Sequence, residues 1–485
     1  MGKPYVKELQ QIEKTYAAVM AMDITALRSS IISASAVPLY AVGSGGSLSA
    51  AHLAAYLHQR LANQFAKAIT PLEAVNLSVP RQSCFWFLSA GGRNADINDA
   101  IKETVIKEPK HLLVICAKTG SPLVRYARNY RYTDIFEFDL PSGRDGFLAT
   151  NSLLAFATLM IRTYQNIFLC NDPSPRTISD LLQHDGSMTS FLSKLRDLCA
   201  PLWTRENLIV LFGPSTQPAA FDLESKFTEA ALGPVLLADY RNFAHGRHHW
   251  LAKRGISSAV LALSADNERH LAHKTLALLP ENIPVVHLDF SNRGIYAPIA
   301  ALATLLHLVA VAGEARAIDP GRPGVPTFGR QIYHLGGLRR LKRERKLDIA
   351  VKRKIQQILE PSENYLSSLK RQHRRFVRKL QQNVFAAIVF DYDGTLCAPE
   401  QRFTGIDADV AKELIRVLKA GVPIGIATGR GKSVRESLRQ AIPSSLWQRV
   451  IVGYYNGAEC ADLHDDTVPD GSDVTCPDLA PLADA

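Results

Sequence analysis

Short apolar runs alternate with longer stretches of helical periodicity along the first two thirds of the chain. Continuous apolar runs of strand length that are separated by helices indicate a parallel sheet covered on both faces. The same order of elements occurs twice, so we expect two similar α/β units in tandem. The predicted strands lie at 37–42, 83–89 and 111–117 in the first unit and at 206–213, 233–239, 257–264 and 283–290 in the second. A buried helix closes each unit, at 151–169 and at 297–315.

A third alternating stretch follows a segment at 317–330 that is rich in Pro and Gly. It has apolar runs at 385–391, 422–428 and 449–455 and a helical stretch at 408–421. The predicted fold class is α/β: two tandem three-layer units with parallel sheets, a basic helical connector, and the first part of a further α/β domain. We place these four parts at residues 1–185, 186–330, 331–383 and 384–485.

The positive charge of the chain is concentrated in one segment. The 485 residues include 56 Lys and Arg against 46 Asp and Glu, a net charge of +10. Between residues 339 and 379 there are fifteen Lys and Arg and four Asp and Glu, so the rest of the chain is close to neutral. Leu and Ile at helical spacing among these charges are typical of a solvated helical connector. A nucleic-acid arm stays open as an alternative, although the segment offers only Tyr365 and Phe376 for stacking on bases.

The apolar segments and the cysteines indicate a cytoplasmic protein. The N-terminal residues are polar and lack the apolar core of a secretory signal, and no apolar run reaches 18 residues. The seven cysteines are scattered, with no C-x-x-C pair, which is typical of reduced thiols. We therefore expect no membrane partner and no disulfide framework.

Glycine-rich turns follow the first two predicted strands. The segment Gly43-Ser44-Gly45-Gly46-Ser47 joins the first strand to a helix, and Ser89, Gly92 and Asn94 lie in the turn after the second strand. Glycines let the backbone approach a ligand, and free amides at a helix N-terminus attract an anion. A tight structural turn is the alternative for the first segment. Because the carboxyl ends of adjacent strands form one crevice, the two turns together predict a phosphate site.

These turns, in two tandem units, resemble the sugar isomerase (SIS) domains, and above all the isomerase half of glutamine–fructose-6-phosphate amidotransferase. The resemblance implies phosphosugar binding by Ser44, Gly45, Gly46, Ser47, Ser89, Gly92, Asn94 and, in a third loop, Thr150. The chain departs from the family at Gly91, Asn94 and Ser152, where Ser, Thr and Lys are usual. The resemblance further implies a homodimer or higher homo-oligomer and no cofactor for this part.

Two residues of the second unit are candidates for isomerase chemistry. Exchange between an aldose and a ketose needs a base that moves a proton between C1 and C2, and often a histidine that opens the sugar ring. The same resemblance implies Glu229 as the base and His245 as the ring-opening residue. A solvated glutamate and a polar histidine loop are the alternatives. The spacing of His245, His248 and His249 also permits a metal site, but no nearby Cys or paired carboxylate supports it.

A second chemical motif, Asp391-Tyr392-Asp393-Gly394-Thr395, directly follows an apolar run. The first carboxylate can attack phosphorus, and the second can protonate the leaving group and then activate water. Mg²⁺ held by Asp391 and the backbone carbonyl of Asp393 would neutralise the charge on the transferring group. With Thr428 and Gly429 as phosphate ligands after the next apolar run, the motif resembles the haloacid dehalogenase (HAD) superfamily of phosphatases. A turn without a catalytic role is the alternative.

The HAD resemblance covers about half of such a domain. The family uses a later Lys and a later acidic pair at a strand end, whereas no Lys follows Lys432 and no acidic pair follows a further apolar strand. We therefore expect a domain that is incomplete in this chain and hydrolyses poorly.

Together these features predict a sugar-phosphate isomerase fused to a Mg²⁺-dependent sugar-phosphate phosphatase. The alternative is a non-catalytic phosphosugar sensor whose basic connector engages nucleic acid or a protein partner. The departures at Gly91, Asn94 and Ser152 favour the sensor, and Glu229 and His245 favour the enzyme.

Overall fold

The computed structural model describes residues 2–77, 82–130, 132–184, 186–338, 362–397 and 405–470. Of the predicted basic connector, 331–383, residues 339–361 lie outside the described residues. The chain forms two compact units, Met1–Glu344 and Arg345–Ala485. Both predicted SIS-type parts fall within the first unit, and the predicted boundary at 185 lies between α9 (Ile178–Leu182) and α10 (Met188–Cys199).

The first half of the first unit contains a five-stranded parallel sheet in the order β2-β1-β3-β4-β5. The strands are β1 (Leu39–Val42), β2 (Ala66–Ile69), β3 (Cys84–Ser89), β4 (His111–Cys116) and β5 (Thr133–Glu137). The register pairs Leu39 with Ala66 on one side and with Cys84 on the other. Every residue of β3 is buried, because both faces of this central strand are covered.

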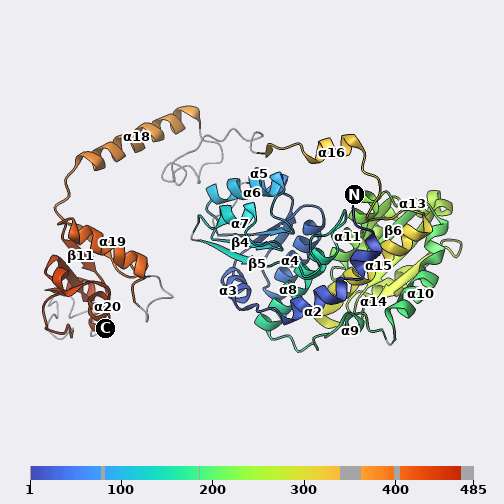
Figure 1. Ribbon diagram of the computed structural model, residues 1–485, viewed down its shortest axis with the longest axis horizontal. Helices are drawn as coiled ribbons and strands as arrows, with labels where there is room; N and C mark the ends of the chain where they lie inside the picture. Colours follow the sequence, from blue (N-terminus) through green and yellow to red (C-terminus); the bar gives the residue numbers. More distant parts are fainter. Residues whose placement is uncertain are drawn as a thin grey trace. The chain divides into compact units, whose positions relative to one another are not determined.

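Helices cover both faces of this sheet (Figure 1). On one face α4 (Gly46–Leu61) and α8 (Asn151–Phe168) pack against Trp86 and Leu113. On the other face α5 (Pro71–Asn76), α6 (Ala95–Ile106) and α7 (Pro122–Ala127) pack against Phe87 and Val114. Successive strand residues therefore point into different cores, which is the reason why the strands read as continuous apolar runs.

The second half repeats this plan with four parallel strands in the order β7-β6-β8-β9. They are β6 (Asn207–Phe212), β7 (Val235–Asp239), β8 (Ser258–Ser264) and β9 (Val285–Asp289). One face is covered by α11 (Gln217–Glu229) and α15 (Ala297–Ala315), and the other by α12 (Tyr240–Asn242), α13 (His249–Arg254) and α14 (Arg269–Leu276). The predicted three-layer α/β architecture with parallel sheets is confirmed.

The two halves share one hydrophobic core. It contains Leu53 of α4, Leu159 of α8, Leu223 of α11 and Leu305 of α15. The N-terminal helices α1 (Tyr5–Leu9), α2 (Ile12–Ala21) and α3 (Thr25–Ala34) add to it. The segment Gly294–Ala315, which includes α15, is long and apolar enough to cross a membrane, but its most apolar stretch is completely buried. We therefore treat α15 as a core helix.

The second unit contains a smaller sheet in the order β10-β11-β12-β13. The strands β10 (Ile388–Asp391), β11 (Ile424–Ala427) and β12 (Val450–Tyr454) are parallel, and β13 (Glu459–Asp462) is antiparallel to β12. The helices α19 (Ala408–Lys419) and α20 (Lys432–Ala441) contribute Leu414 and Leu438 to its core. Val389 on β10 is 73% exposed and Ile451 on β12 is 53% exposed, so apolar strand residues remain open to solvent in the described part of this unit.

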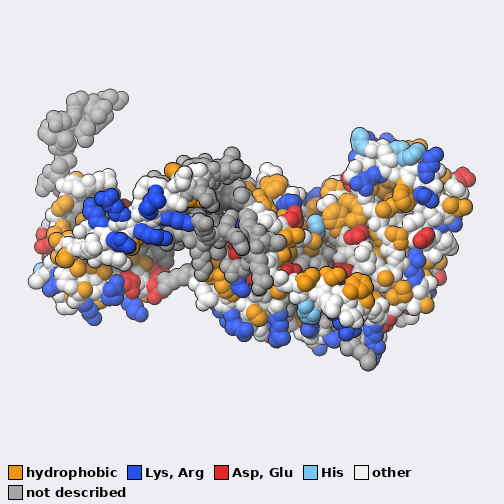
Figure 2. Space-filling view, turned by 90° about the horizontal axis from the view of Figure 1, so that it is seen from above, with side chains coloured by type: hydrophobic (Ala, Val, Ile, Leu, Met, Phe, Trp, Pro, Cys, Tyr) orange, Lys and Arg blue, Asp and Glu red, His pale blue; other side chains and the backbone are white. Residues whose placement is uncertain are grey.

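The described end of the basic connector is α18 (Glu363–Gln382). The hydroxyl of Ser362 caps it by accepting from the amide of Tyr365 at 3.3 Å. Its cationic side chains are Lys370, Arg371, Arg374, Arg375, Arg378 and Lys379, and Figure 2 shows Lys and Arg side chains gathered on this part of the second unit. The helical character expected for the connector is thus present from residue 363 onward.

Candidate functional site

The two glycine-rich turns of the first half lie at the same edge of the sheet. β1 and β3 are neighbours, and their register pairs Val42 with Phe87. The chain leaves β1 into α4 on one face of the sheet and leaves β3 into α6 on the other face. Adjacent parallel strands connected in this way leave a crevice between their carboxyl ends, where α/β proteins bind ligands. We call the space between turns 43–47 and 89–94 the first crevice.

In the turn after β1, Gly46 packs closely against Ala149, whereas Gly45 borders open space. Gly45 has a φ of +53°, in the left-handed region that favours glycine. A Cβ added there would meet no atom within 4 Å. A Cβ added to Gly46 would lie 2.1 Å from the Cβ of Ala149, so only glycine fits at that position. A ligand can therefore approach the backbone at Gly45.

Unused hydrogen-bond donors line the first crevice. Among the described residues, the amides of Ser44, Gly45, Ala90 and Gly91 donate to no acceptor, and the hydroxyls of Ser44 and Ser47 have no partner. The turn after β1 leads directly into α4, a helix of 16 residues whose positive end adds to these donors. Free amides together with a helix N-terminus attract an anion.

The side chains of Ser89 and Asn94 hold the second turn in shape. The Oγ of Ser89 accepts a hydrogen bond from the amide of Gly92 at 3.0 Å. The Oδ1 of Asn94 accepts from two amides in the first turn of α6, at 2.8 and 3.3 Å, and so caps this helix. Arg93, between these residues, is exposed and forms no ion pair with the described residues. Ser89 and Asn94 thus position the turn, while their contacts to a ligand stay a prediction.

Thr150 is not available to a ligand in this conformation, contrary to the role that the family resemblance implied. Its side chain is fully buried, and its hydroxyl lies 2.7 Å from Oε2 of Glu8 and 3.2 Å from Oδ1 of Asp145. Asp145 also accepts from the amides of Thr150 and Ser152, at 3.1 and 3.0 Å, and thereby caps α8. Burial raises the pKa of Glu8. The carboxylates of Glu8 and Asp145 therefore bind the hydroxyl of Thr150, which the family resemblance assigned to the sugar.

The second sheet has a matching crevice that is occupied by the side chain of Glu268. It lies between the turns after β6 and β8, which lead into α11 and α14 on opposite faces. The carboxylate of Glu268 accepts from the amide of Ser215 at 3.1 Å, from its hydroxyl at 2.8 Å and from the amide of Ala265 at 3.0 Å. A Cβ on Gly213 would lie 2.0 Å from the Cγ of Glu268. The donors of this crevice are thus taken by a buried carboxylate of the same chain.

Glu229 and His245 are both exposed on the second half. Glu229 lies at the end of α11, and its Oε1 accepts from the hydroxyl of Ser225 at 2.7 Å. His245 lies in the turn Phe243–Arg247, next to Gly246 with a φ of +106°. Among the described residues, no hydrogen bond joins Glu229 or His245 to the first crevice. The catalytic roles of Glu229 and His245 at the first crevice therefore stay predictions.

The histidines of this turn do not assemble into a metal site. In the part of the chain that the structure describes, no group of three His, Cys, Asp or Glu side chains is placed to hold a metal ion. The alternative drawn from the spacing of His245, His248 and His249 thus has no geometric support.

The helix α11 carries a buried ion pair that the sequence did not predict. The Nζ of Lys226 lies 2.6 Å from Oδ1 of Asp222, and both side chains are almost completely buried. Burial and the nearby Asp222 carboxylate hold the pKa of Tyr5 well above its usual range. The helical spacing of Asp222 and Lys226 permits such a pair, but nothing in the local pattern shows that this face of α11 is buried.

In the second unit, the two predicted carboxylates meet the predicted threonine at the carboxyl edge of the sheet. Asp391 ends β10 opposite Ala427, the last residue of β11. The hydroxyl of Thr395 donates to Oδ2 of Asp391 at 2.9 Å, and that of Thr428 donates to Oδ2 of Asp393 at 3.1 Å. The D-x-D-G-T motif and the Thr428 turn therefore form one cluster.

Arg430 belongs to the same cluster, although sequence reasoning did not select it. Its Nη1 lies 3.4 Å from Oδ1 of Asp393, and its amide donates to the hydroxyl of Thr428 at 3.0 Å. Its guanidinium also lies over the ring of Tyr392, 5.6 Å from the ring centre. Gly429 lies between Thr428 and Arg430 of this group, and a Cβ there would lie 3.1 Å from Oδ1 of Asn456. The cluster thus combines two carboxylates, two hydroxyls and a cation.

Comparison with known proteins identifies the fold. No family model matches the chain, and no curated protein matches it. The tagatose-6-phosphate ketose/aldose isomerase from Escherichia coli is similar in structure, with 16% identity and a TM-score of 0.52 over 67% of this chain and 98% of that chain. The C-terminal domain of glucosamine-fructose-6-phosphate aminotransferase from Francisella tularensis is similar with 15% identity and a TM-score of 0.50, over 65% and 96% of the two chains. At these identities the likeness establishes a shared fold.

Proposed function

We propose that the first unit binds a sugar phosphate in the first crevice and interconverts its aldose and ketose forms. The observation that carries the proposal is the row of free amides at Ser44, Gly45, Ala90 and Gly91 beside the N-terminus of α4. These donors suit the oxygens of a phosphate group. The similar structures named above include an isomerase of a sugar phosphate, which agrees with this chemistry.

The chemistry requires one base and one group that opens the sugar ring. In the proposal, the carboxylate of Glu229 takes the proton from C2 of the open-chain aldose and returns it to C1. His245 moves the proton that opens the ring. Because both residues are exposed and not joined to the first crevice of their own chain, we propose a homodimer in which each chain completes the site of its partner.

Deuterium exchange tests the isomerase proposal. The chain is incubated with a hexose 6-phosphate in deuterated water, and we expect deuterium to enter at C1 or C2. Glu229→Gln should abolish the exchange while phosphosugar binding is retained, because only the base is lost. Glu224→Gln is the matched control, since Glu224 lies on the same helix and also accepts from a hydroxyl four residues away, that of Thr228 at 3.1 Å. Equal exchange by wild type and Glu229→Gln would refute the assignment.

A non-catalytic phosphosugar sensor is the second candidate. It is favoured by the occupied hydroxyl of Thr150, and by Ser152, whose side chain donates to Asp145 at 2.5 Å instead of providing a cation for the sugar. Phosphosugar binding by the wild-type chain without any deuterium exchange would decide for the sensor.

For the second unit we propose phosphoryl transfer at Asp391. Its carboxylate attacks the phosphorus of a phosphate ester, and Asp393 protonates the leaving oxygen and then activates a water molecule. Thr428, the amide of Gly429 and Arg430 hold the phosphoryl oxygens.

The carboxylates of Asp391 and Asp393 and the neighbouring main-chain carbonyls are hard oxygen donors, the type of ligand that Mg²⁺ takes together with water. Their meeting at one sheet edge fits such a site. Bound Mg²⁺ would neutralise charge on the phosphoryl group.

Hydrolysis of p-nitrophenyl phosphate with added Mg²⁺ tests this proposal. We expect slow turnover by the wild-type chain that is lost in Asp391→Asn and retained in Asp462→Asn, a control on β13 of the same sheet. Equal rates in wild type and Asp391→Asn would refute the nucleophile.

A further inference from the structure

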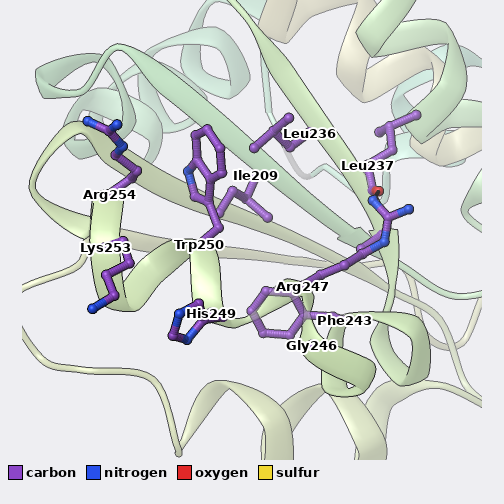
Figure 3. Close-up of a pocket in the computed structure, with 11 residues that line it drawn as sticks. Ile209, Leu236, Leu237, Phe243, Gly246, Arg247, His249, Trp250, Lys253 and Arg254 are labelled. Carbon is purple, nitrogen blue, oxygen red and sulfur yellow. Dashed lines mark hydrogen bonds between the residues drawn. The ribbon is translucent and has the colours of Figure 1, made fainter.

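A pocket of about 440 Å³ lies on the second half of the first unit. Its floor is formed by Ile209 of β6 and by Leu236 and Ala238 of β7, and its wall by Phe243 and Trp250 (Figure 3). Ile209 and Ala238 belong to the core on the face of the sheet opposite to α11. The pocket is therefore separate from the shared core and from both crevices at the carboxyl edges of the sheets.

The rim of the pocket is cationic. Arg247, His249, Lys253 and Arg254 line it, and no Asp or Glu does. The whole segment 240–254 has four Lys and Arg and no acidic residue. Lys253 and Arg254 form no ion pair with the described residues, and Arg247 donates to the carbonyl oxygen of Leu237 at 3.3 Å. Such a group of unpaired cations raises the local concentration of anions.

The wall presents a flat aromatic surface. The indole of Trp250 is 40% exposed, and its Nε1 donates to the hydroxyl of Ser258 at 3.0 Å, which fixes the ring. Figure 3 shows the ring pointing toward Ile209 and Leu236, with Lys253 and Arg254 on one side and Arg247 on the other. An apolar floor with a fixed aromatic wall and a few charged groups is typical of a small-molecule site.

We infer that this pocket is a second ligand site of the protein, for a small organic anion with a planar apolar body. The apolar body lies against Trp250 and the strand residues, and the anionic group lies between Arg247 and the pair Lys253 and Arg254. Charge and shape together select this class, because the apolar floor leaves the hydroxyls of a sugar phosphate without partners and an uncharged hydrocarbon leaves the cations unpaired. Since Phe243 and Arg247 flank His245 in one turn, the ligand contacts the segment that carries this histidine.

Two probes with the same ring system but different charge test the inference on the full chain. Anilinonaphthalene sulfonate carries an anionic group, and N-phenylnaphthylamine does not. We expect the sulfonate to bind to the wild-type chain with energy transfer from tryptophan and more tightly than the amine. In Lys253→Gln/Arg254→Gln the affinity for the sulfonate should fall about tenfold, the size expected for losing charge-assisted hydrogen bonds, with no change for the amine.

Two further variants make the result decisive. Lys7→Gln/Arg28→Gln removes two exposed cations that form no ion pair with described residues and should leave both affinities unchanged. Trp250→Ala removes the wall and should weaken both probes. No binding of the sulfonate to the wild type, or equal loss in the two double variants, would overturn the inference. Phosphosugar binding is measured in parallel, so a failure of this site is distinguished from a failure of the first crevice.

Discussion

In the first half of the first unit the amides of Gly45 and Gly91 have no acceptor among the described residues, whereas in the second half the amides of Ser215 and Ala265 donate to Glu268. Both sets of amides follow the carboxyl ends of two adjacent strands of a parallel sheet, β1 and β3 in the first and β6 and β8 in the second. We therefore expect this fold to favour an anion site in each half, which one carboxylate of the same chain is enough to close. We expect such a side chain, and not the sheet, to decide whether a crevice of this fold binds a ligand.

Removing the internal carboxylate should have the largest effect. In Glu268→Ala, the buried donors of Ser215 and Ala265 lose their acceptor, which we expect to cost about 3 kcal/mol of the free energy of unfolding. Thermal unfolding with and without inorganic phosphate measures this. Phosphate should raise the Tm of Glu268→Ala more than that of the wild type, because it enters the vacated crevice. Equal stability of the variant and the wild type would contradict the view that Glu268 closes the crevice of the second half.

Closing the first crevice should abolish its ligand binding. In Gly45→Val a branched side chain enters the left-handed position and covers the open side of the turn. We expect the affinity for a hexose 6-phosphate to fall at least about thirtyfold, ~2 kcal/mol, by calorimetric titration. Gly324→Val is the control, because Gly324 also has a positive φ, of +80°, and open space around an added Cβ, but lies outside both turns of the first crevice. Undiminished binding by Gly45→Val would place the ligand elsewhere.

The stability of the core that the two halves share should depend on pH, because His307 of α15 is buried there. Burial lowers the pKa of His307 to about 4, and neither of its ring nitrogens has a hydrogen-bond partner in the described residues. The unfolded chain therefore binds this proton more readily, so stability is lost as the pH falls from the unfolded value near 6.5 toward 4.

Between pH 7 and pH 5 we expect His307 to account for about 2 kcal/mol of this loss. Urea unfolding at the two pH values should show a smaller loss for His307→Leu than for the wild type. An identical pH dependence of the two proteins would contradict the assignment.

The smallest effect is expected from Arg93. This guanidinium stands at the turn before α6 without an ionic partner, and a cation beside a helix N-terminus is unfavourable unless an anion lies between them. Arg93→Gln should weaken phosphosugar binding about tenfold and reduce its dependence on salt. Arg28→Gln, at an exposed position on α3, serves as the control. If both variants bind as tightly as the wild type, backbone amides alone hold the phosphate.

Sequence reasoning located the central elements because their signals are local. The apolar runs correspond to β1, β3 and β4 and to all four strands of the second sheet, and the buried helices to α8 and α15. The strands β2 and β5 were missed, since Ala66–Ile69 and Thr133–Glu137 lie at the sheet edges and mix polar with apolar residues. The antiparallel strand β13 was missed for the same reason.

Among the candidate sites, too, the features with local signals were predicted, and the contacts between distant residues were not. The glycine turns and the D-x-D-G-T motif follow from local turn chemistry, and the structure brings Asp391, Asp393 and Thr428 to one edge. The carboxylates of Glu8 and Glu268 could not be found, because their partners lie 142 and 53 residues away in the sequence. A single acidic residue in a polar loop gives no local sign of such a contact.

The burial of α15 has a consequence for synthesis of the chain. Its packing partners α8, α10 and α11 all precede it in the sequence, so they have left the ribosome before this apolar helix does. A nascent chain that stops before Ala297 therefore leaves their apolar surface bare, and we expect such fragments to aggregate or to be captured by chaperones. The two halves repeat one plan in sequence order, yet we expect them to fold only as one piece.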